Sequence, residues 1–173
     1  MTQGPARLGA WQVVRPLGAG GMGAVYLVEH AETRARRALK LVRPGPGRDL
    51  SRASREVEAL ARVDGHPNVV RVHDCGELDE PGQPALWVVM DLAEGGDLGA
   101  RLARGPLPVA EVVALGRALA RGLAHVHARG VLHRDLKPAN VLFDERGAPK
   151  LVDFGVARVD DAVRLTRSGD VVG

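Results

Sequence analysis

The apolar pattern of this 173-residue chain changes once, near residue 93, and the change divides the sequence into two parts. Before it, short apolar stretches rich in β-branched and aromatic residues predict strands. After it, valine and leucine recur at helical spacing from Pro108 to Arg129. We therefore predict an α+β chain of two parts joined by a linker. The first part is a five-stranded antiparallel sheet with one helix over residues 1–92, the linker covers 93–97, and the second part is incomplete and mainly helical over 98–173.

The strands are predicted where apolar stretches lie between turn-forming residues. In the first part they are Trp11–Pro16, Ala24–Glu29, Arg36–Val42, Val69–Asp74 and Leu86–Met90. The single helix of that part contains Val57 and Leu60 and ends before Gly65. Short strands are also predicted after the long helix, at Val131–Leu132, Val141–Phe143 and Lys150–Val152.

Composition excludes several classes of protein. With 24 basic and 21 acidic residues the net charge is only +3, and the arginines are scattered, so no nucleic-acid surface is predicted. The longest apolar runs are too short to cross a bilayer, so no membrane segment is predicted. A single cysteine, Cys75, and the absence of a secretory signal pattern predict a cytoplasmic location. His66, His73 and Cys75 do not have the spacing of a metal site and are predicted to be structural.

A cluster of glycines follows the first predicted strand. Gly18, Gly20 and Gly23 lack side chains, so the backbone N–H groups between them could approach phosphate oxygens closely. A glycine-rich hairpin without a ligand explains this motif equally well. A dinucleotide-binding fold does not, because there a helix follows the glycines directly, whereas here a strand follows.

Lysine is rare in this chain. Only three of the 24 basic residues are lysine, namely Lys40, Lys137 and Lys150. Lys40 lies at the end of the third strand, beside the glycine hairpin, where its ammonium could hold a phosphate. A buried ammonium needs an acidic partner, and Glu56 on the next helix is the preferred one. The alternative is a solvated lysine at a strand end.

The most specific signal is the run from His133 to Asn140, His-Arg-Asp-Leu-Lys-Pro-Ala-Asn, which Asp153-Phe154-Gly155 follows. It combines a carboxylate, a cation and an amide in one loop, with a second carboxylate 18 residues after Asp135. Metal-assisted phosphoryl transfer to a hydroxyl needs one carboxylate to accept from the hydroxyl and another to hold the metal. A charged surface loop is a poor alternative for a motif of this length.

These motifs together resemble the protein kinase family, in its bacterial serine/threonine form. They span nearly the whole chain in the family's order: the glycine-rich loop, the strand lysine, the catalytic loop and Asp-Phe-Gly. The resemblance implies a bilobal kinase fold. It also implies transfer of the ATP γ-phosphate to serine or threonine hydroxyls of proteins, with ATP and Mg²⁺ as cofactors.

The resemblance also implies a role for each matched residue. Lys40 would hold the α- and β-phosphates and pair with Glu56, Asp135 would be the catalytic base, Lys137 would steady the γ-phosphate, and Asn140 and Asp153 would bind Mg²⁺. The nucleotide site would comprise Gly18, Ala19, Gly20, Gly21, Met22, Gly23, Val25, Ala38, Lys40, Met90, Asp91, Ala93, Asp97 and Leu142. Within this set Met90 would gate the back of the pocket and Asp97 would meet the ribose. His133, Phe154 and Leu60 would stack as an internal column.

Regulation and partners are implied as well. Arg134 beside the catalytic aspartate implies control by a phosphate on the following loop, where Thr166 and Ser168 are the candidate acceptors. These two could equally be ordinary polar loop residues. A kinase homodimer would allow phosphorylation in trans. Because the family continues with an Ala-Pro-Glu motif and further helices, we expect the chain to be the N-terminal portion of a kinase domain. The alternative is an ATP-binding or regulatory kinase-like module without turnover.

Overall fold

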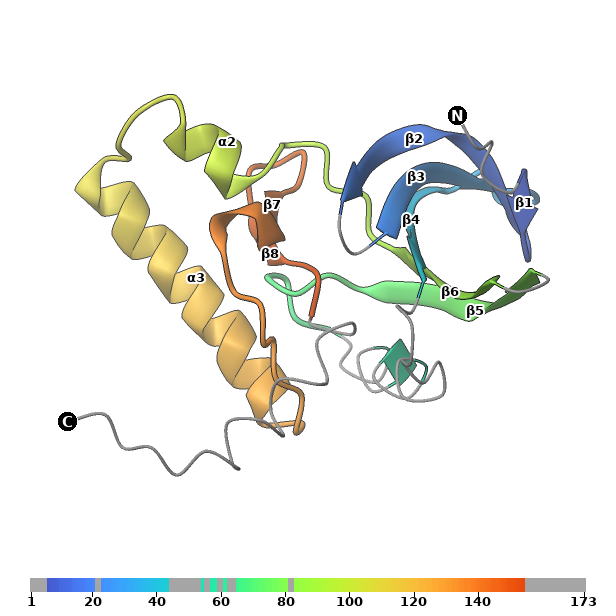
Figure 1. The fold of residues 1–173 in the computed structure, drawn as a ribbon. Coiled ribbons are helices and arrows are strands. Elements are labelled where there is room, and N and C mark those ends of the chain that lie inside the picture. The colour runs from blue at the N-terminus through green and yellow to red at the C-terminus, as the bar shows by residue number, and fades with distance from the viewer. Residues whose placement is uncertain are drawn as a thin grey trace, which may run out of the picture.

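A computed structural model describes residues 6–20, 23–43, 54, 57–58, 61, 65–80 and 83–154. Figure 1 shows a strongly curved sheet at one end and the long helix α3 (Val109–His127) at the other. Between them lies a small sheet of β7 (Val141–Phe143) and β8 (Pro149–Leu151). The chain therefore has the two-part α+β arrangement predicted from the sequence.

The curved sheet has six strands in the order β1-β2-β3-β4-β6-β5, and all its pairs are antiparallel. The strands are β1 (Arg7–Leu8), β2 (Trp11–Gly20), β3 (Gly23–His30), β4 (Arg36–Val42), β5 (Val72–Glu80) and β6 (Gln83–Met90). The predicted count of five missed β1, whose two residues are too few to give an alternating pattern. Leu8 of β1 is buried beside Trp11, its partner in the register.

Alternation along β4 decides which side chains can reach the site. Leu39 and Leu41 are fully buried in an apolar core on one face of the sheet. Successive side chains of a strand point to opposite faces, so Ala38 and Lys40 lie on the other face. Lys40 is paired there with Val25 of β3 and with Val88 of β6. The strand thus holds a lysine in the middle of a sheet face.

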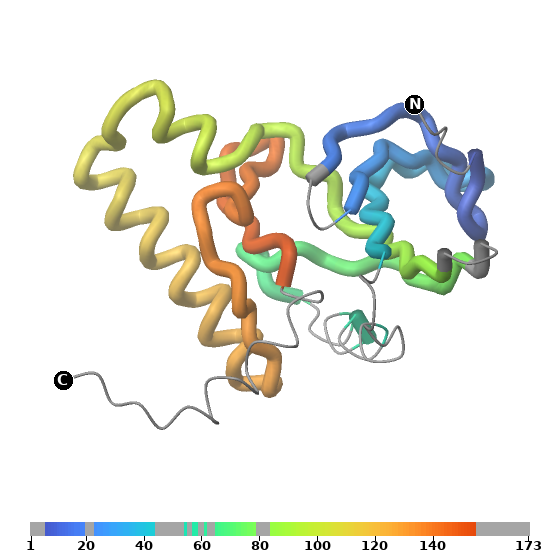
Figure 2. The backbone as a smooth tube through the Cα atoms, viewed as in Figure 1, coloured from blue at the N-terminus to red at the C-terminus, as the bar shows by residue number. Residues whose placement is uncertain are grey.

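The predicted strand Val69–Asp74 is correct only in its second half. Val69 and Val70 lie outside the curved sheet and run beside β8, where the Val70 N–H donates to the Leu151 carbonyl at 2.9 Å. Both valines belong to the apolar core of the C-terminal part, together with Val126 and Val141. Figure 2 shows this segment passing next to the red end of the trace. The sequence pattern did not reveal that Val69 and Val70 lie outside the curved sheet, because a sheet position and a position beside β8 both suit β-branched residues.

The long helix is packed at one end and exposed at the other. Near its C-terminal end Val126 is fully buried, and a Cβ at Gly122 would lie 3.1 Å from the Asn68 carbonyl. At its N-terminal end Val109 is 81% exposed. Gly130 (φ 75°) follows the helix. Among the described residues, no helix is both long and apolar enough to cross a membrane.

Three other local features of the structure can be compared with the sequence predictions. Val131–Leu132 is not a strand, because the Val131 N–H donates to the Val126 carbonyl and completes the end of α3. The short helix α2 (Leu98–Leu102) was not predicted. Within 44–64, the described residues Ser54, Val57, Glu58 and Ala61 are helical. Val57 is buried against Val42, Leu86 and Val88 on the second face of the sheet.

Candidate active site

A cavity of about 440 Å³ opens between the curved sheet and β7. It brings together residues from both ends of the described chain, with β2 to β4 on one side, the segment after β6 at the back, and β7 and Asp153 on the other side. Its lining residues are Arg15, Leu17, Gly18, Val25, Ala38, Lys40, Met90, Asp91, Leu92, Ala93, Glu94, Gly96, Ala139, Leu142, Val152 and Asp153.

Lys40 and Asp153 meet in this cavity although 113 positions separate them in sequence, with the lysine Nζ 2.6 Å from the aspartate Oδ1. Their side chains are 12% and 29% exposed, so the pair is partly shielded from water. Asp153 has a φ of 57°, a left-handed conformation that is uncommon for a residue with a side chain and that is enriched at functional sites. The pair joins the sheet to the segment after β8.

The catalytic-loop motif forms a compact hydrogen-bonded cluster. Asp135 is 7% exposed, and its Oδ2 accepts from Lys137 Nζ at 2.7 Å and from Asn140 Nδ2 at 3.0 Å. The same Asn140 amide donates to the Asp135 carbonyl at 2.8 Å. Asn140 ends a short 3-10 turn that begins at Pro138. These donors fix the orientation of the carboxylate.

His133 and Phe154 stack with ring centroids 4.6 Å apart. Burial lowers the pKa of His133, and this effect outweighs the opposing influence of nearby backbone groups and of the Asp135 and Asp153 carboxylates. The imidazole is therefore a neutral packing element near pH 7. Leu60, the third residue expected in this column, lies outside the described residues.

Apolar residues of the predicted nucleotide site lie on facing sides of the cavity. Ala38 pairs with Met90 in the sheet, while Leu142 lies on β7. Asp97 caps the short helix α2, where its Oδ1 accepts from the Ala100 N–H at 2.8 Å. Glu94, three residues earlier, lines the cavity, and the ribose contact expected of Asp97 stays a prediction.

The glycines of the first hairpin differ in whether the fold itself requires them. Gly23 has a φ of 124°, and a Cβ there would clash with the Leu41 carbonyl, so the fold itself requires glycine. A Cβ at Gly18, which lines the cavity, would meet nothing within 4 Å. Ala19 and Gly20 pair with Ala24 and Gly23 in the hairpin.

Several predicted site residues lie outside the described part of the chain, namely Gly21, Met22, Glu56, Thr166 and Ser168. The expected Lys40–Glu56 pair is therefore not described, and the partner found for Lys40 is Asp153. Sequence reasoning missed the lining residues Arg15, Leu17, Glu94, Gly96, Ala139 and Val152. Most of these lie within one or two positions of a predicted residue, so adjacency was the signal that could have found them.

Asn140 and Asp153 offer donor chemistry that fits Mg²⁺. The Asn140 Nδ2 is used by Asp135, which leaves the amide oxygen as a ligand, and Asp153 provides carboxylate oxygen. Within the described ranges, no three or more His, Cys, Asp or Glu side chains form a metal-binding group. Mg²⁺ suits such a sparse set because it binds through one or two carboxylates together with substrate phosphates.

Comparison with known families identifies the fold to which this site belongs. The sequence matches the protein kinase domain over residues 11–167. The chain belongs to the protein kinase family. The kinase cavity, catalytic loop and Asp-Phe-Gly segment described above all lie within the matched range.

Similar kinases occur in several bacteria. The chain is 42% identical to the serine/threonine-protein kinase PknI of Mycobacterium tuberculosis over 175 residues, which is 94% of this chain and 29% of PknI. It is 38% identical to the DNA damage-responsive serine/threonine-protein kinase RqkA of Deinococcus radiodurans, covering all of this chain and 26% of RqkA. The crystal structure of the M. tuberculosis PknI kinase domain superposes with a TM-score of 0.75 at 42% identity, covering 86% of this chain and 59% of that domain. The chain thus spans less than a third of the length of these curated relatives.

Proposed function

We propose that this chain carries the nucleotide-binding and catalytic residues of a serine/threonine protein kinase, which transfers the γ-phosphate of ATP to protein hydroxyls. The observation that carries the proposal is the meeting of Lys40 and Asp153, 2.6 Å apart, in one cavity. Their contact brings the sheet lysine and the Asp-Phe-Gly aspartate within reach of the same triphosphate.

The lining of the cavity supports separate binding positions for the adenine and for the phosphates of the nucleotide. Val25 and Ala38 on one side and Leu142 on the other would enclose the adenine, while the backbone of Asp91 to Ala93 would bind its polar edge. The space beside Gly18 would admit the phosphates close to the backbone. Lys40 would contact the α- and β-phosphates.

Asn140 and Asp153 would hold Mg²⁺, which on binding neutralises charge on the phosphate oxygens. Asp135 would orient the serine or threonine hydroxyl and accept its proton as the oxygen attacks the γ-phosphorus. The new O–P bond forms as the bond to the β-phosphate oxygen breaks, and ADP leaves. Lys137, whose side chain is 43% exposed, would steady the transferred phosphoryl group.

Regulation by phosphorylation is part of the proposal. Thr166 or Ser168 would receive a phosphate from a second copy of the kinase, and Arg134 beside the catalytic base would bind that phosphate. Phosphopeptide mapping after incubation with ATP·Mg²⁺ would identify the acceptor. A cytoplasmic location is proposed because Cys75 is the single cysteine of the sequence.

Replacement of Asp135 by asparagine tests the proposal. Calorimetry should show that the chain binds ATP·Mg²⁺, and γ-phosphate transfer to a protein acceptor should fall by about a hundredfold or more in Asp135→Asn, because the general base is lost. Nucleotide binding should persist in this variant. The matched control is Glu145→Gln, at an exposed carboxylate in the turn between β7 and β8.

Two results would contradict the proposal in different ways. Equal transfer by Asp135→Asn and the unsubstituted chain would exclude Asp135 as the base. Binding of ATP without transfer by the unsubstituted chain would favour the nucleotide-binding module without turnover.

A further inference from the structure

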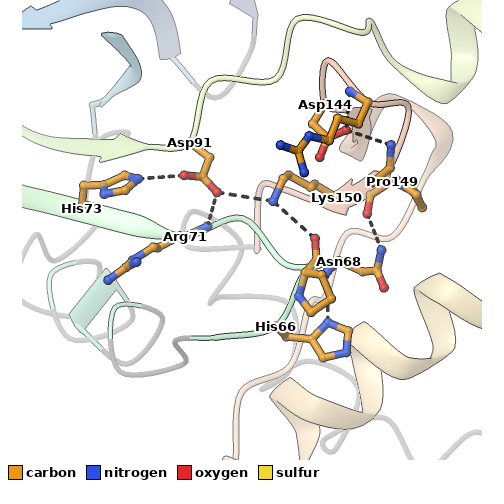
Figure 3. Close-up of polar contacts among 11 residues, drawn as sticks. His66, Asn68, Arg71, His73, Asp91, Asp144, Pro149 and Lys150 are labelled. Atoms are coloured by element: carbon orange, nitrogen blue, oxygen red, sulfur yellow. Dashed lines mark hydrogen bonds and ion pairs between the residues drawn. The ribbon is translucent and has the colours of Figure 1, made fainter. Parts of the chain in front are cut away.

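Lys150, the third lysine of the chain, has no role in the proposed chemistry and lies on the opposite side of Asp91 from the nucleotide cavity. Its Nζ is 3.5 Å from Asp91 Oδ2 and donates to the Pro67 carbonyl at 3.3 Å. The side chain is only 15% exposed. Figure 3 shows it reaching from β8 toward Asp91, so it connects β8 to the segment that follows β6.

Asp91 has polar contacts with two other segments of the chain, residues 71–73 and β8. Its Oδ1 lies 2.7 Å from His73 Nε2 on β5, and its Oδ2 accepts from the Arg71 N–H at 3.4 Å. In return the Asp91 N–H donates to the Arg71 carbonyl at 3.0 Å. His73 and the Arg71 backbone therefore contact both the carboxylate and the backbone of Asp91 (Figure 3).

The charge state of Asp91 agrees with this arrangement. Burial alone would raise the pKa of its carboxyl, but the hydrogen bond from His73 and the charge of Lys150 outweigh burial and lower it. Asp91 is thus ionised at neutral pH. A partly buried carboxylate with these partners resists displacement, because movement would separate its charge from them.

Asp91 also forms part of the wall between two cavities. It lines the nucleotide cavity and, on the other side, a cavity of about 330 Å³ that Lys150 and Arg71 also line. Lys150 pairs with Leu142 in the β7–β8 register, and Leu142 lines the nucleotide cavity. The contacts of Lys150 therefore fix the position of Asp91 relative to Leu142, on the other side of the nucleotide cavity.

We propose that Lys150 and His73 are positioning residues that hold the backbone at Asp91 at the distance from Leu142 that adenine recognition requires. This inference rests on the proposed function. It concerns the adenine end of the nucleotide alone, because the phosphate end is held by Lys40 and by the glycine hairpin.

Three ligands separate this role from a purely structural one. Adenosine needs only the adenine end, Mg²⁺-triphosphate needs only the phosphate end, and ATP·Mg²⁺ needs both. In Lys150→Met, calorimetry should show adenosine and ATP binding about tenfold more weakly, because a charged hydrogen-bonding partner of Asp91 is lost. Mg²⁺-triphosphate binding should not change.

Conservative and control variants sharpen the experiment. Lys150→Arg should restore most of the adenosine affinity, since a guanidinium can still pair with Asp91. Arg117→Met, at an exposed cation on α3, should bind all three ligands like the unsubstituted chain. His73→Leu removes a second side-chain contact to Asp91 and should also weaken adenosine binding selectively. This variant decides the question should Lys150→Met fail to fold.

The outcomes distinguish the inference from the function beneath it. If the unsubstituted chain does not bind ATP·Mg²⁺, the proposed function fails and the inference fails with it. If it binds ATP but the variants bind adenosine equally well, only the positioning role is wrong. A parallel loss for all three ligands would also overturn that role, because it would indicate general destabilisation.

Discussion

Two lysine–aspartate pairs join the same regions of the molecule on opposite sides of the nucleotide cavity. On the front, Lys40 of β4 contacts Asp153 at 2.6 Å, and both residues line the cavity. On the back, Lys150 of β8 lies 3.5 Å from Asp91, which His73 and the Arg71 backbone also contact. Both residues of the front pair line the nucleotide cavity, whereas Lys150 of the back pair does not, and Asp91 has His73 and Arg71 as further protein partners. The residue types of an ion pair are thus not enough to assign its role. The role depends on which cavity and which other protein groups the pair faces.

Substitution of the front lysine should have the largest effect. Lys40→Met removes the cation proposed to contact the phosphates, so kcat/KM for ATP should fall by about a hundredfold or more. Lys40→Arg should not restore it, because a planar guanidinium does not replace a compact ammonium at this position. Steady-state phosphotransfer assays would measure both.

Comparison of the two arginine variants sharpens the contrast. The back position should tolerate arginine, since only charge pairing with Asp91 is required there, whereas the front position should not. Equal tolerance of arginine at positions 40 and 150 would remove the distinction drawn between the two pairs.

Two glycines of the hairpin extend the contrast between ligand-facing and protein-facing groups. Gly23→Ala should lower the free energy of unfolding by about 1–3 kcal/mol, because the new Cβ would clash with the Leu41 carbonyl at a positive φ. Gly18→Ala should leave thermal stability unchanged and weaken ATP binding. Thermal unfolding and calorimetry would measure the two effects. A stable Gly23→Ala variant would show that the hairpin can shift away from β4.

The smallest effect concerns pH. The pKa of His133 is lowered below 6.5 in the folded chain, so the unfolded chain binds the proton more tightly. The stability that neutral His133 contributes is present above pH 6.5 and is lost as the pH falls toward the lowered pKa. His133→Phe should therefore lose less thermal stability between pH 7.5 and pH 5.5 than the unsubstituted chain.

The control for this experiment is His127→Gln, at an exposed histidine of α3, which should keep the original pH dependence. Melting temperatures across the pH range provide the measurement. An unchanged slope in His133→Phe would assign the acid sensitivity to other groups, among them His66, whose pKa is also lowered by burial and by His125 and Arg121.

Features encoded in contiguous residues were predictable, and features made by distant contacts were not. The strands around the glycine hairpin and the long helix follow from local pattern, and the catalytic loop from its motif. The contact of Asp91 with Lys150 joins positions 59 residues apart, and no local rule selects it. His73 was predicted to be structural, but its partner was not identifiable. The capping of α2 by Asp97 was also not predicted, because aspartate suits both a ribose contact and a helix cap.

The segment of residues 65–71 gives the molecule a second connection between its two parts. Asn68 Nδ2 donates to the Pro149 carbonyl at 2.8 Å, and the Leu151 N–H donates to the Asn68 carbonyl at 2.9 Å, so this segment is bound to β8 independently of residues 93–97. The two connections, at residues 93–97 and at Asn68, define a line about which the curved sheet and the C-terminal part can rotate relative to each other. We therefore expect the cavity to widen and narrow by rotation about this line, whereas sliding or twisting of one part against the other would first have to break the hydrogen bonds at Asn68.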